Sequence, residues 1–253
     1  MADYKDYFDD QLELLESLEA LHFKKVELKK QIETLRGACQ EPFVVELSGL
    51  PRTGKTSCMQ RVYDFFKAGN IAVQRTMEPA YLIKQNLSLK EIRQMSNLEF
   101  NDRALQVSKE SLAAAKESNP DIILMDRGIV DNYFWYQMLF NEGKIDIDVY
   151  EQKLLTLASD LLKIDQLFVL VAAPKVTILR DYINQIYLED RVKTTLERVQ
   201  NLKYGFEQLL PSIREKIDSK REVVELDTSS LSEMDTAVFV ADKIMDGMNR
   251  KIK

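Results

Sequence analysis

Hydrophobic positions after residue 42 follow two alternating patterns. Short runs of apolar residues predict buried strands, and these runs fall at 43–47, 71–76, 121–126, 167–171 and 222–226. Between the runs, apolar residues recur at steps of three and four, which predicts amphipathic helices. We expect these helices over 56–68, 88–95, 97–118, 129–141, 149–164, 175–217 and 232–249. Strands that alternate with helices in this way are typical of an α/β fold whose parallel sheet is covered on both faces.

Residues 1–40 follow a different pattern. Positions separated by alternating steps of three and four run from Tyr4 to Leu35, with Gln11 and Lys25 as polar members. This heptad spacing predicts one long, coiled-coil-like helix. Its acidic residues precede its basic ones, so two copies could pair antiparallel with opposite charges facing each other. Two interpretations stay open: a homodimer formed through residues 4–35, or a helix that packs on its own domain.

The length of the chain, 253 residues, allows one large α/β domain with an appendage. We place a single boundary near residues 40–42, because Pro42 separates the long helix from the first strand. The expected organisation is therefore a helix over residues 1–40 and one domain over residues 41–253.

Composition narrows the class of protein. The hydrophobic share of 45% is sufficient for a core, and the net charge of −6 argues against duplex nucleic acid as a partner. The two cysteines, Cys39 and Cys58, do not suggest a disulfide framework, which fits a reducing compartment. The longest apolar run, from Leu167 to Pro174, is too short to cross a membrane, and the acidic N-terminus does not resemble a signal peptide. We expect a cytoplasmic protein.

The first strand leads directly into a phosphate-binding motif. Residues 49–56 read Gly-Leu-Pro-Arg-Thr-Gly-Lys-Thr, which fits G-x-x-x-x-G-K-[ST] between a strand and a helix. Gly49 and Gly54 let the backbone N–H groups turn toward phosphate oxygens. Lys55 reaches the outer phosphates, and Thr56 offers a hydroxyl to Mg²⁺. We therefore expect ATP and Mg²⁺ to bind here, with further loop residues in contact with the nucleotide: Pro51, Thr53 and Ser57.

The carboxyl ends of the other predicted strands carry further polar residues. Glu78 follows the second strand, Asp126 and Arg127 end the third, and Asp227 follows the fifth. Parallel-sheet folds bind ligands at this edge, so these side chains should lie near the phosphate-binding loop. Asp126 after four apolar residues is typical of a Walker B carboxylate, which would hold Mg²⁺ together with Thr56. The alternative is a carboxylate that only caps the next helix.

These motifs occur in the same order in a known group of enzymes. The sequence resembles the thymidylate kinase and deoxynucleoside kinase group of P-loop phosphotransferases over nearly everything after residue 42. The matching segments are the P-loop, Glu78-Pro79, the Phe-Asn-Asp-Arg-Ala of residues 100–104, Asp126-Arg127 before an aromatic helix, and Glu189-Asp190-Arg191 with the helix after it. The resemblance implies a three-layer α/β/α fold with a five-stranded parallel sheet in the order 2-3-1-4-5, and a helical lid around residues 180–205.

The resemblance also implies how the chain would hold ATP. Lys55, Arg52 and the lid residue Arg191 would contact the γ-phosphate. The adenine would lie near Arg180 and Asp227. Arg191 is flanked by Glu189 and Asp190, and the alternative for it is a solvated charged face.

On the acceptor side, the resemblance implies that Phe100, Arg103 and Arg127 bind the substrate. Guanidinium groups match phosphate oxygens in pairs, which suits an anionic acceptor. Glu78 would act as the base toward a hydroxyl acceptor, or would bind the sugar or orient Arg127 if the acceptor is a phosphate. The alternative for Arg103 is an exposed partner of a nearby carboxylate.

The departures from this resemblance all concern the acceptor. Ala80 and Tyr81 stand in place of two glycines, Pro51 in place of a P-loop carboxylate, and Gly128 in place of a larger residue. We expect an ATP-dependent kinase that acts on a nucleoside or nucleoside monophosphate. The alternatives are a P-loop kinase of another small acceptor or of a modified base in DNA, and a regulatory NTPase that signals through its N-terminal helix.

Overall fold

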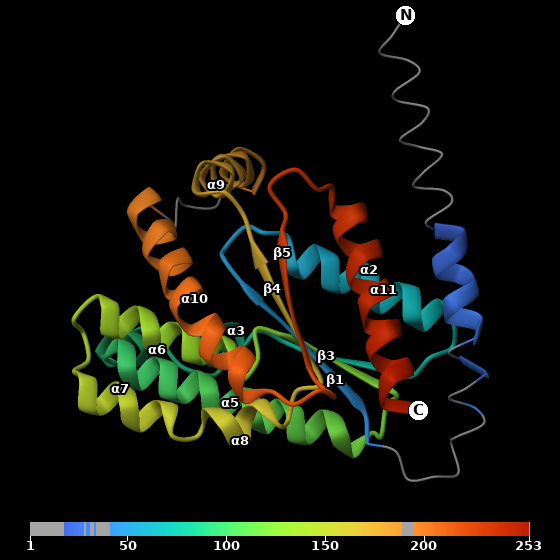
Figure 1. Ribbon diagram of the computed structural model, residues 1–253. Coiled ribbons are helices and arrows are strands. Elements are labelled where there is room, and N and C mark those ends of the chain that lie inside the picture. The colour runs from blue at the N-terminus through green and yellow to red at the C-terminus, as the bar shows by residue number, and fades with distance from the viewer. Residues whose placement is uncertain (1–17, 28, 31–32, 34–40, 189–194, 253) are drawn as a thin grey trace, which may run out of the picture.

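The computed structural model describes residues 18–27, 29–30, 33, 41–188 and 195–252. Its centre is a five-stranded parallel sheet in the order β2-β3-β1-β4-β5, which confirms the order expected from the family resemblance (Figure 1). The strands are β1 Phe43–Gly49, β2 Val73–Thr76, β3 Ile122–Asp126, β4 Gln166–Val171 and β5 Glu222–Asp227. Every residue of the three central strands is buried, and most of them are apolar, which is why their sequences show no regular alternation of polar and apolar residues.

The register of the sheet fixes what meets at its carboxyl edge. Strand β1 lies between β3 and β4, with Leu47 opposite Asp126 and Gly49 opposite Leu170. The end of β1 therefore delivers the phosphate-binding motif beside the carboxylate that ends β3. The ends of β1 and β3 lie side by side although they are far apart in the sequence, because both strands run parallel through the same sheet.

Helices cover both faces of the sheet (Figure 1). On one face, α2 Lys55–Ala68 and α11 Glu233–Ile252 pack on apolar residues of β1, β3 and β4. On the other face lie α5 Asn97–Glu117, α6 Asp131–Asn141, α8 Leu157–Leu161 and α10 Leu196–Lys216. Successive side chains of each central strand point to opposite faces of the sheet, so alternate residues pack against the helices on one face or the other. The three-layer α/β/α architecture is thus confirmed.

Some helix boundaries differ from the prediction. The segment after β2 forms a helix, α3 Pro79–Asn86, that the hydrophobic pattern did not indicate, because only Pro79 and Ile83 of it are buried. The helix expected over 149–164 is two short helices, α7 Ile147–Leu154 and α8. Two serines, Ser88 and Ser96, start α4 Leu89–Gln94 and α5 with complete capping boxes. The helical stretch expected over 175–217 is α9 Pro174–Leu188 and α10, with residues 189–194 between them outside the described part.

The described part of the N-terminal segment is helical over residues 18–27 and packs on its own domain. Leu21 is 3% exposed within the core formed by α2 and α11. The ammonium of Lys25 lies 4.1 Å from the centroid of the Phe65 ring and donates to the Phe65 carbonyl. Lys24 donates to Asp242 of α11 at 2.6 Å. These turns therefore agree with the interpretation of a helix that packs on its own domain. Pairing through residues 4–35 stays a prediction, because most of those positions lie outside the described residues.

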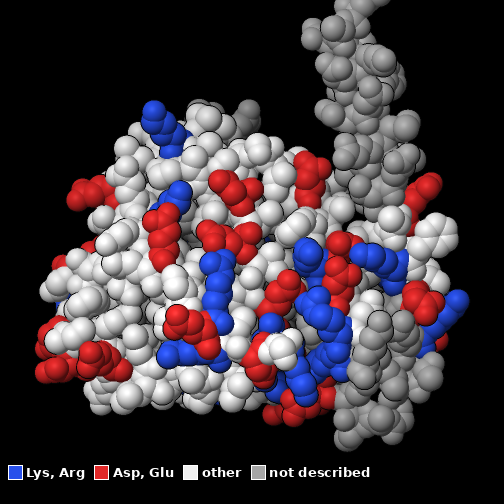
Figure 2. Space-filling model, in the orientation of Figure 1, with Lys and Arg blue, Asp and Glu red and all other residues white. Residues whose placement is uncertain are grey.

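Acidic and basic side chains lie interspersed on the face of the molecule drawn in Figure 2. This mixture agrees with the modest net charge of −6. None of the described helices is long and apolar enough to cross a membrane.

Candidate functional site

The loop between β1 and α2 adopts backbone conformations that favour glycine. Gly49 has a φ of 128°, and a Cβ atom on it would lie 2.0 Å from the carbonyl oxygen of Leu170. Gly54 has a φ of 83° and forms the N-cap of α2 without any side-chain cap. The loop thus wraps around the N-terminus of a 14-residue helix, where free backbone N–H groups and the helix dipole favour an anion.

Lys55 lies inside this loop and is 6% exposed. Its ammonium donates to the carbonyl of Gly49 at 3.1 Å, to the carbonyl of Leu50, and to the hydroxyl of Thr53 at 3.3 Å. Burial, and to a lesser degree the neighbouring charge of Arg127, lower the pKa of Lys55 to about 7. An anion bound in the loop would favour the charged form, because an opposite charge raises the pKa of an amine.

Thr56 and Asp126 meet beside the loop. The Thr56 hydroxyl donates to Oδ2 of Asp126 at 3.1 Å, and Asp126 is 6% exposed. A hydroxyl and a carboxylate at this spacing are the oxygen ligands that Mg²⁺ takes beside a polyphosphate. The donor set therefore fits the predicted magnesium site.

A cavity of about 630 Å³ opens over the phosphate-binding loop, and we call it the P-loop cavity. Most residues predicted to hold ATP line it, namely Pro51, Arg52, Thr53, Gly54, Lys55, Thr56, Ser57 and Arg180. Arg52 has a φ of 59°, and its Nε donates to the buried Asp181 of α9 at 2.7 Å. Arg180 donates to the Thr228 carbonyl at 2.6 Å, which ties α9 to the loop after β5.

Among the described residues, Gly49 and Asp227 are the ones that were predicted to bind ATP and do not line this cavity. Gly49 is required instead for the close approach of its backbone to β4. Asp227 is exposed and accepts hydrogen bonds from the backbone and hydroxyl of Ser229, at 2.8 and 2.5 Å. Thr228 lines the cavity instead, since neighbouring residues at the end of a strand point in opposite directions. A role of Asp227 in binding the nucleotide stays a prediction.

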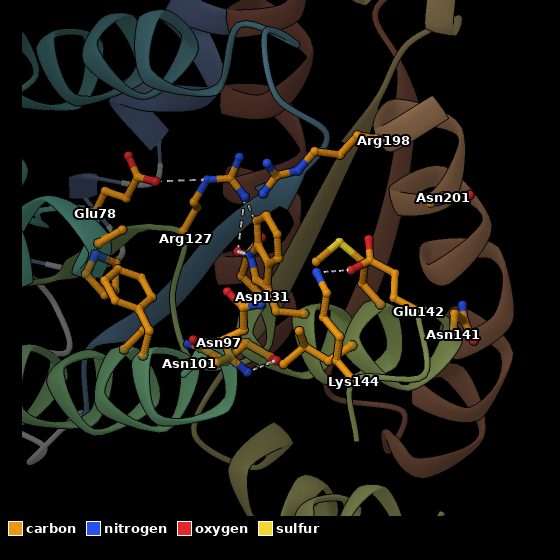
Figure 3. A pocket seen from close by; sticks show the side chains of 18 of the residues that line it. Glu78, Asn97, Asn101, Arg127, Asp131, Asn141, Glu142, Lys144, Arg198 and Asn201 are labelled. Carbon is orange, nitrogen blue, oxygen red and sulfur yellow. Dashed lines mark hydrogen bonds and ion pairs between the residues drawn. The ribbon is translucent and has the colours of Figure 1, made fainter. Parts of the chain in front are cut away.

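A larger cavity, of about 1050 Å³, lies between α3, α5, α6 and the start of α10, and we call it the large cavity (Figure 3). Three residues predicted to bind the acceptor line it, namely Glu78, Phe100 and Arg127. Several lining residues were not predicted, among them Lys84, Asn97, Trp135, Arg198 and Asn201. Figure 3 shows Arg198 extending from α10 toward Arg127. Aromatic rings, amides and cations thus face one space, which suits a flat polar ligand.

Arg127 is the charged centre of this region. Its Nε lies 3.3 Å from Oε1 of Glu78, and its Nη1 lies 3.1 Å from Oδ2 of Asp131 (Figure 3). Burial disfavours the charge on Arg127, but Asp131 and Glu78 together raise its pKa above the usual value. Asp131 is fixed in turn by the Ser48 hydroxyl at 2.5 Å and the Trp135 indole at 3.0 Å. The left-handed φ of Arg127, 53°, stores backbone strain at the point where the two cavities meet.

The two cavities share three lining residues, Glu78, Lys84 and Arg127. Glu78 is the N-cap residue of α3, and Lys84 lies farther along the same helix. A group bound in the P-loop cavity can therefore meet a group bound in the large cavity only beside these side chains.

Arg103 is not brought into this arrangement. It is exposed on α5 and lines a separate groove against α3, with Leu82, Asn86 and Leu87. Phe100 and Ala104 face the large cavity, and Arg103 lies about 100° around the helix from Ala104. A role of Arg103 in binding the acceptor stays a prediction. Arg191 lies outside the described residues.

Glu46 is a buried carboxylate that the sequence analysis missed. It sits in the middle of β1, is 0% exposed, and accepts hydrogen bonds from the backbone N–H groups of Val130 and Asp131 at 3.0 and 2.7 Å. A Cβ on Gly128 would lie 2.5 Å from its Oε2, which explains why glycine follows Asp126-Arg127 in this chain. Glu46 thereby holds the start of α6 and, with it, Asp131.

We expect Glu46→Gln to change how stability depends on pH. Burial raises the pKa of Glu46 from 4.5 to about 7, so the folded state keeps this proton between those values while the unfolded state releases it. Below pH 4.5, this group contributes about 3 kcal/mol to the free energy of unfolding. The contribution is lost as the pH rises from 4.5 to about 7. Urea unfolding at pH 5 and pH 8 should show a smaller decline for the variant than for wild type. Glu215→Gln, an exposed change on α10, should keep the wild-type decline; equal declines in all three proteins would contradict the assignment.

The comparisons with known proteins bear on this arrangement. A family model described as an AAA domain matches residues 44–204. Among solved structures, the chain is similar to that of "deoxyadenosine kinase from M.mycoides with bound dATP". The match covers 79% of this chain and 98% of that chain, with 14% sequence identity and a TM-score of 0.56. At this identity the likeness concerns the fold. No curated protein sequence matches the chain significantly.

Proposed function

The chain belongs to this AAA domain family, whose model spans residues 44–204, and from that premise we propose that it is an ATP-dependent phosphotransferase. Its fold is that of the P-loop kinases, which bind nucleotides at the loop after the first strand. The proposed reaction moves the γ-phosphoryl group of ATP to a nucleoside, with a nucleoside monophosphate as the second candidate acceptor. We also propose that two copies pair through residues 4–35 and that the protein is cytoplasmic.

The observation that carries the proposal is the position of Glu78. Its carboxylate lines both cavities, its side chain is 42% exposed, and Arg127 holds it at 3.3 Å. A carboxylate placed between donor and acceptor can accept the proton of an attacking hydroxyl. It would repel the oxygens of a phosphate acceptor, whose charge Arg127 can counter only in part, because Asp131 and Glu78 already bind its guanidinium. These contacts favour a hydroxyl acceptor.

The donor side follows from the P-loop cavity. The backbone N–H groups at the start of α2 bind the phosphates, and Lys55 exchanges its contacts with loop carbonyls for the outer phosphate oxygens. Arg52 and Arg180 line the same cavity. Thr56 and Asp126 would hold Mg²⁺, which neutralises charge on the phosphates when it is bound.

The acceptor side follows from the large cavity. The acceptor oxygen attacks the γ-phosphorus, the bond from that phosphorus to the bridging oxygen breaks, and its electron pair leaves with ADP. A nucleoside hydroxyl gives its proton to Glu78, whereas an acceptor phosphate has no proton to give. Trp135 and Phe100 offer aromatic faces to a base, and the amide of Asn97 offers a hydrogen-bond donor and acceptor.

Trp135 allows a direct test, because it is the single tryptophan of the chain and lines the large cavity. Titration with nucleosides and nucleoside monophosphates, in the presence of AMP-PNP and Mg²⁺, should change its fluorescence in a saturable way for the correct acceptor. Transfer is then followed as a phosphorylated product formed in equal amount to ADP. ADP formed together with free phosphate, without any phosphorylated acceptor, would instead indicate an NTPase. No saturable response to any of these compounds would remove the nucleoside from the proposal.

A further inference from the structure

Helix α3 carries a lysine to the place where the two cavities meet. Glu78 is the N-cap residue of this helix, and Ile83, at 2% exposed, anchors its inner side. Ala80 and Lys84, four residues apart, both line the large cavity, as neighbours on one helix face do. Lys84 also lines the P-loop cavity, a property it shares with Glu78 and Arg127.

The cations around this junction differ in what they bind. Arg127 is engaged by Glu78 and Asp131, and Arg52 by Asp181. Lys84 is exposed, and among the described residues it makes no hydrogen bond or ion pair. A lysine at the mouth of both cavities therefore has its three donors available to a ligand. It supports no neighbouring side chain in the described part of the chain, so the packing of that part does not require a cation there.

We propose that Lys84 is a catalytic residue, which binds the phosphoryl group while it passes from ATP to the acceptor. This inference rests on the proposed function and adds a residue to it. During transfer, the bond between the γ-phosphorus and the bridging oxygen breaks with its electron pair on ADP, and the bond to the acceptor oxygen forms. A hydroxyl proton goes to Glu78. The side chain of Lys84 takes no part in this proton transfer, and its charge neutralises charge on the oxygens of the group in transit.

The position of Lys84 explains why this charge is useful in addition to Lys55. Lys55 belongs to the loop that holds the phosphates of ATP before transfer, whereas Lys84 faces the space into which the phosphoryl group moves. A contact that is stronger in transit than in the ground state accelerates the chemical step. Removing Lys84 should therefore weaken binding of a transition-state mimic far more than binding of ATP itself.

The test compares two probes on the full chain. Mg²⁺ with AMP-PNP reports the ground state, and Mg²⁺ with ADP and aluminium fluoride mimics the phosphoryl group in transit. In Lys84→Met we expect the dissociation constant for the fluoride complex to rise about 100-fold, and that for AMP-PNP to change less than about 3-fold. Lys84→Arg should recover part of the loss, because it restores the charge. Lys90→Met removes an exposed lysine of α4 that lines neither cavity and should behave as wild type.

The outcomes separate this inference from the proposed function. If wild type does not bind AMP-PNP, the proposed function is wrong and the role of Lys84 is wrong with it. If wild type binds AMP-PNP and the fluoride complex, and Lys84→Met binds both equally well, only the role of Lys84 is overturned. A wild-type protein that binds ADP no more tightly with the fluoride also overturns it. Thermal unfolding of Lys84→Met should match wild type, which excludes a folding defect as the cause of any loss.

Discussion

Replacing Lys55 with methionine is expected to lower phosphoryl transfer by about 1000-fold. The amine is 6% exposed, and its position inside the loop leaves it within reach of both loop carbonyls and bound phosphates. Methionine keeps most of the apolar stem, so the loop should stay packed while the charge is lost. Steady-state kinetics with the acceptor identified by fluorescence, together with equilibrium binding of AMP-PNP, measures the effect.

Lys67→Met is the matched control for this change. It removes the same charge from the last turn of the same helix, where the side chain is exposed and its ammonium lies 5.4 Å from the centroid of the Tyr63 ring. Activity of this control should stay within about 2-fold of wild type, since surface changes rarely disturb more than their own contacts. Wild-type turnover by Lys55→Met would show that the P-loop does not take part in the reaction.

Glu78→Gln should lower kcat by about 100- to 10,000-fold, the range typical of a lost general base. The amide keeps the size of the side chain and its place beside Arg127, but it cannot take a proton from the acceptor. Binding of AMP-PNP and of the nucleoside should change little, because neither contact requires the charge. Kinetics over the same concentrations as for wild type separate kcat from KM.

The result with Glu78→Gln also distinguishes the two candidate acceptors. A small loss of kcat with a raised KM would mean that Glu78 only positions the acceptor, and a nucleoside monophosphate would then be the substrate. Glu117→Gln near the end of α5 provides the control, because it removes an exposed carboxylate that lines neither cavity. A loss in that control equal to the loss in Glu78→Gln would point to a general effect of net charge.

Local sequence was sufficient to predict the elements with strong periodicity. The P-loop, its helix and the strand ending at Asp126 follow from motif spelling and apolar runs, which act over fewer than about 20 residues. The weakly amphipathic α3 was not predicted, because a helix with only two buried residues shows almost no hydrophobic periodicity. The helix expected over 149–164 was divided for a similar reason, since packing on α6 and α10 decides where it breaks.

The direction in which a side chain points was harder to predict than the helix or strand that carries it. Asp227 ends β5 and Arg103 lies on α5, but neither lines the P-loop cavity or the large cavity, and their roles in binding stay predictions. A shift of one position reverses a strand side chain and rotates a helix side chain by about 100°, so a segment likeness cannot fix its face. Lys84 and Glu46 had no motif to mark them, because their surroundings come from segments far away in the chain.

Local patterns in the sequence were sufficient to predict a phosphate-binding loop on a parallel α/β sheet, because glycine spacing and strand periodicity involve only residues close together in the chain. The order of the strands came from family resemblance and was confirmed by the structure. The side chains that lie where the two cavities meet could be identified only from the folded structure. Glu78, Lys84 and Arg127 come from two segments about 45 residues apart, and parallel pairing of β2 with β3 brings them together. Which charges face a shared space depends on this packing, and no local pattern records it.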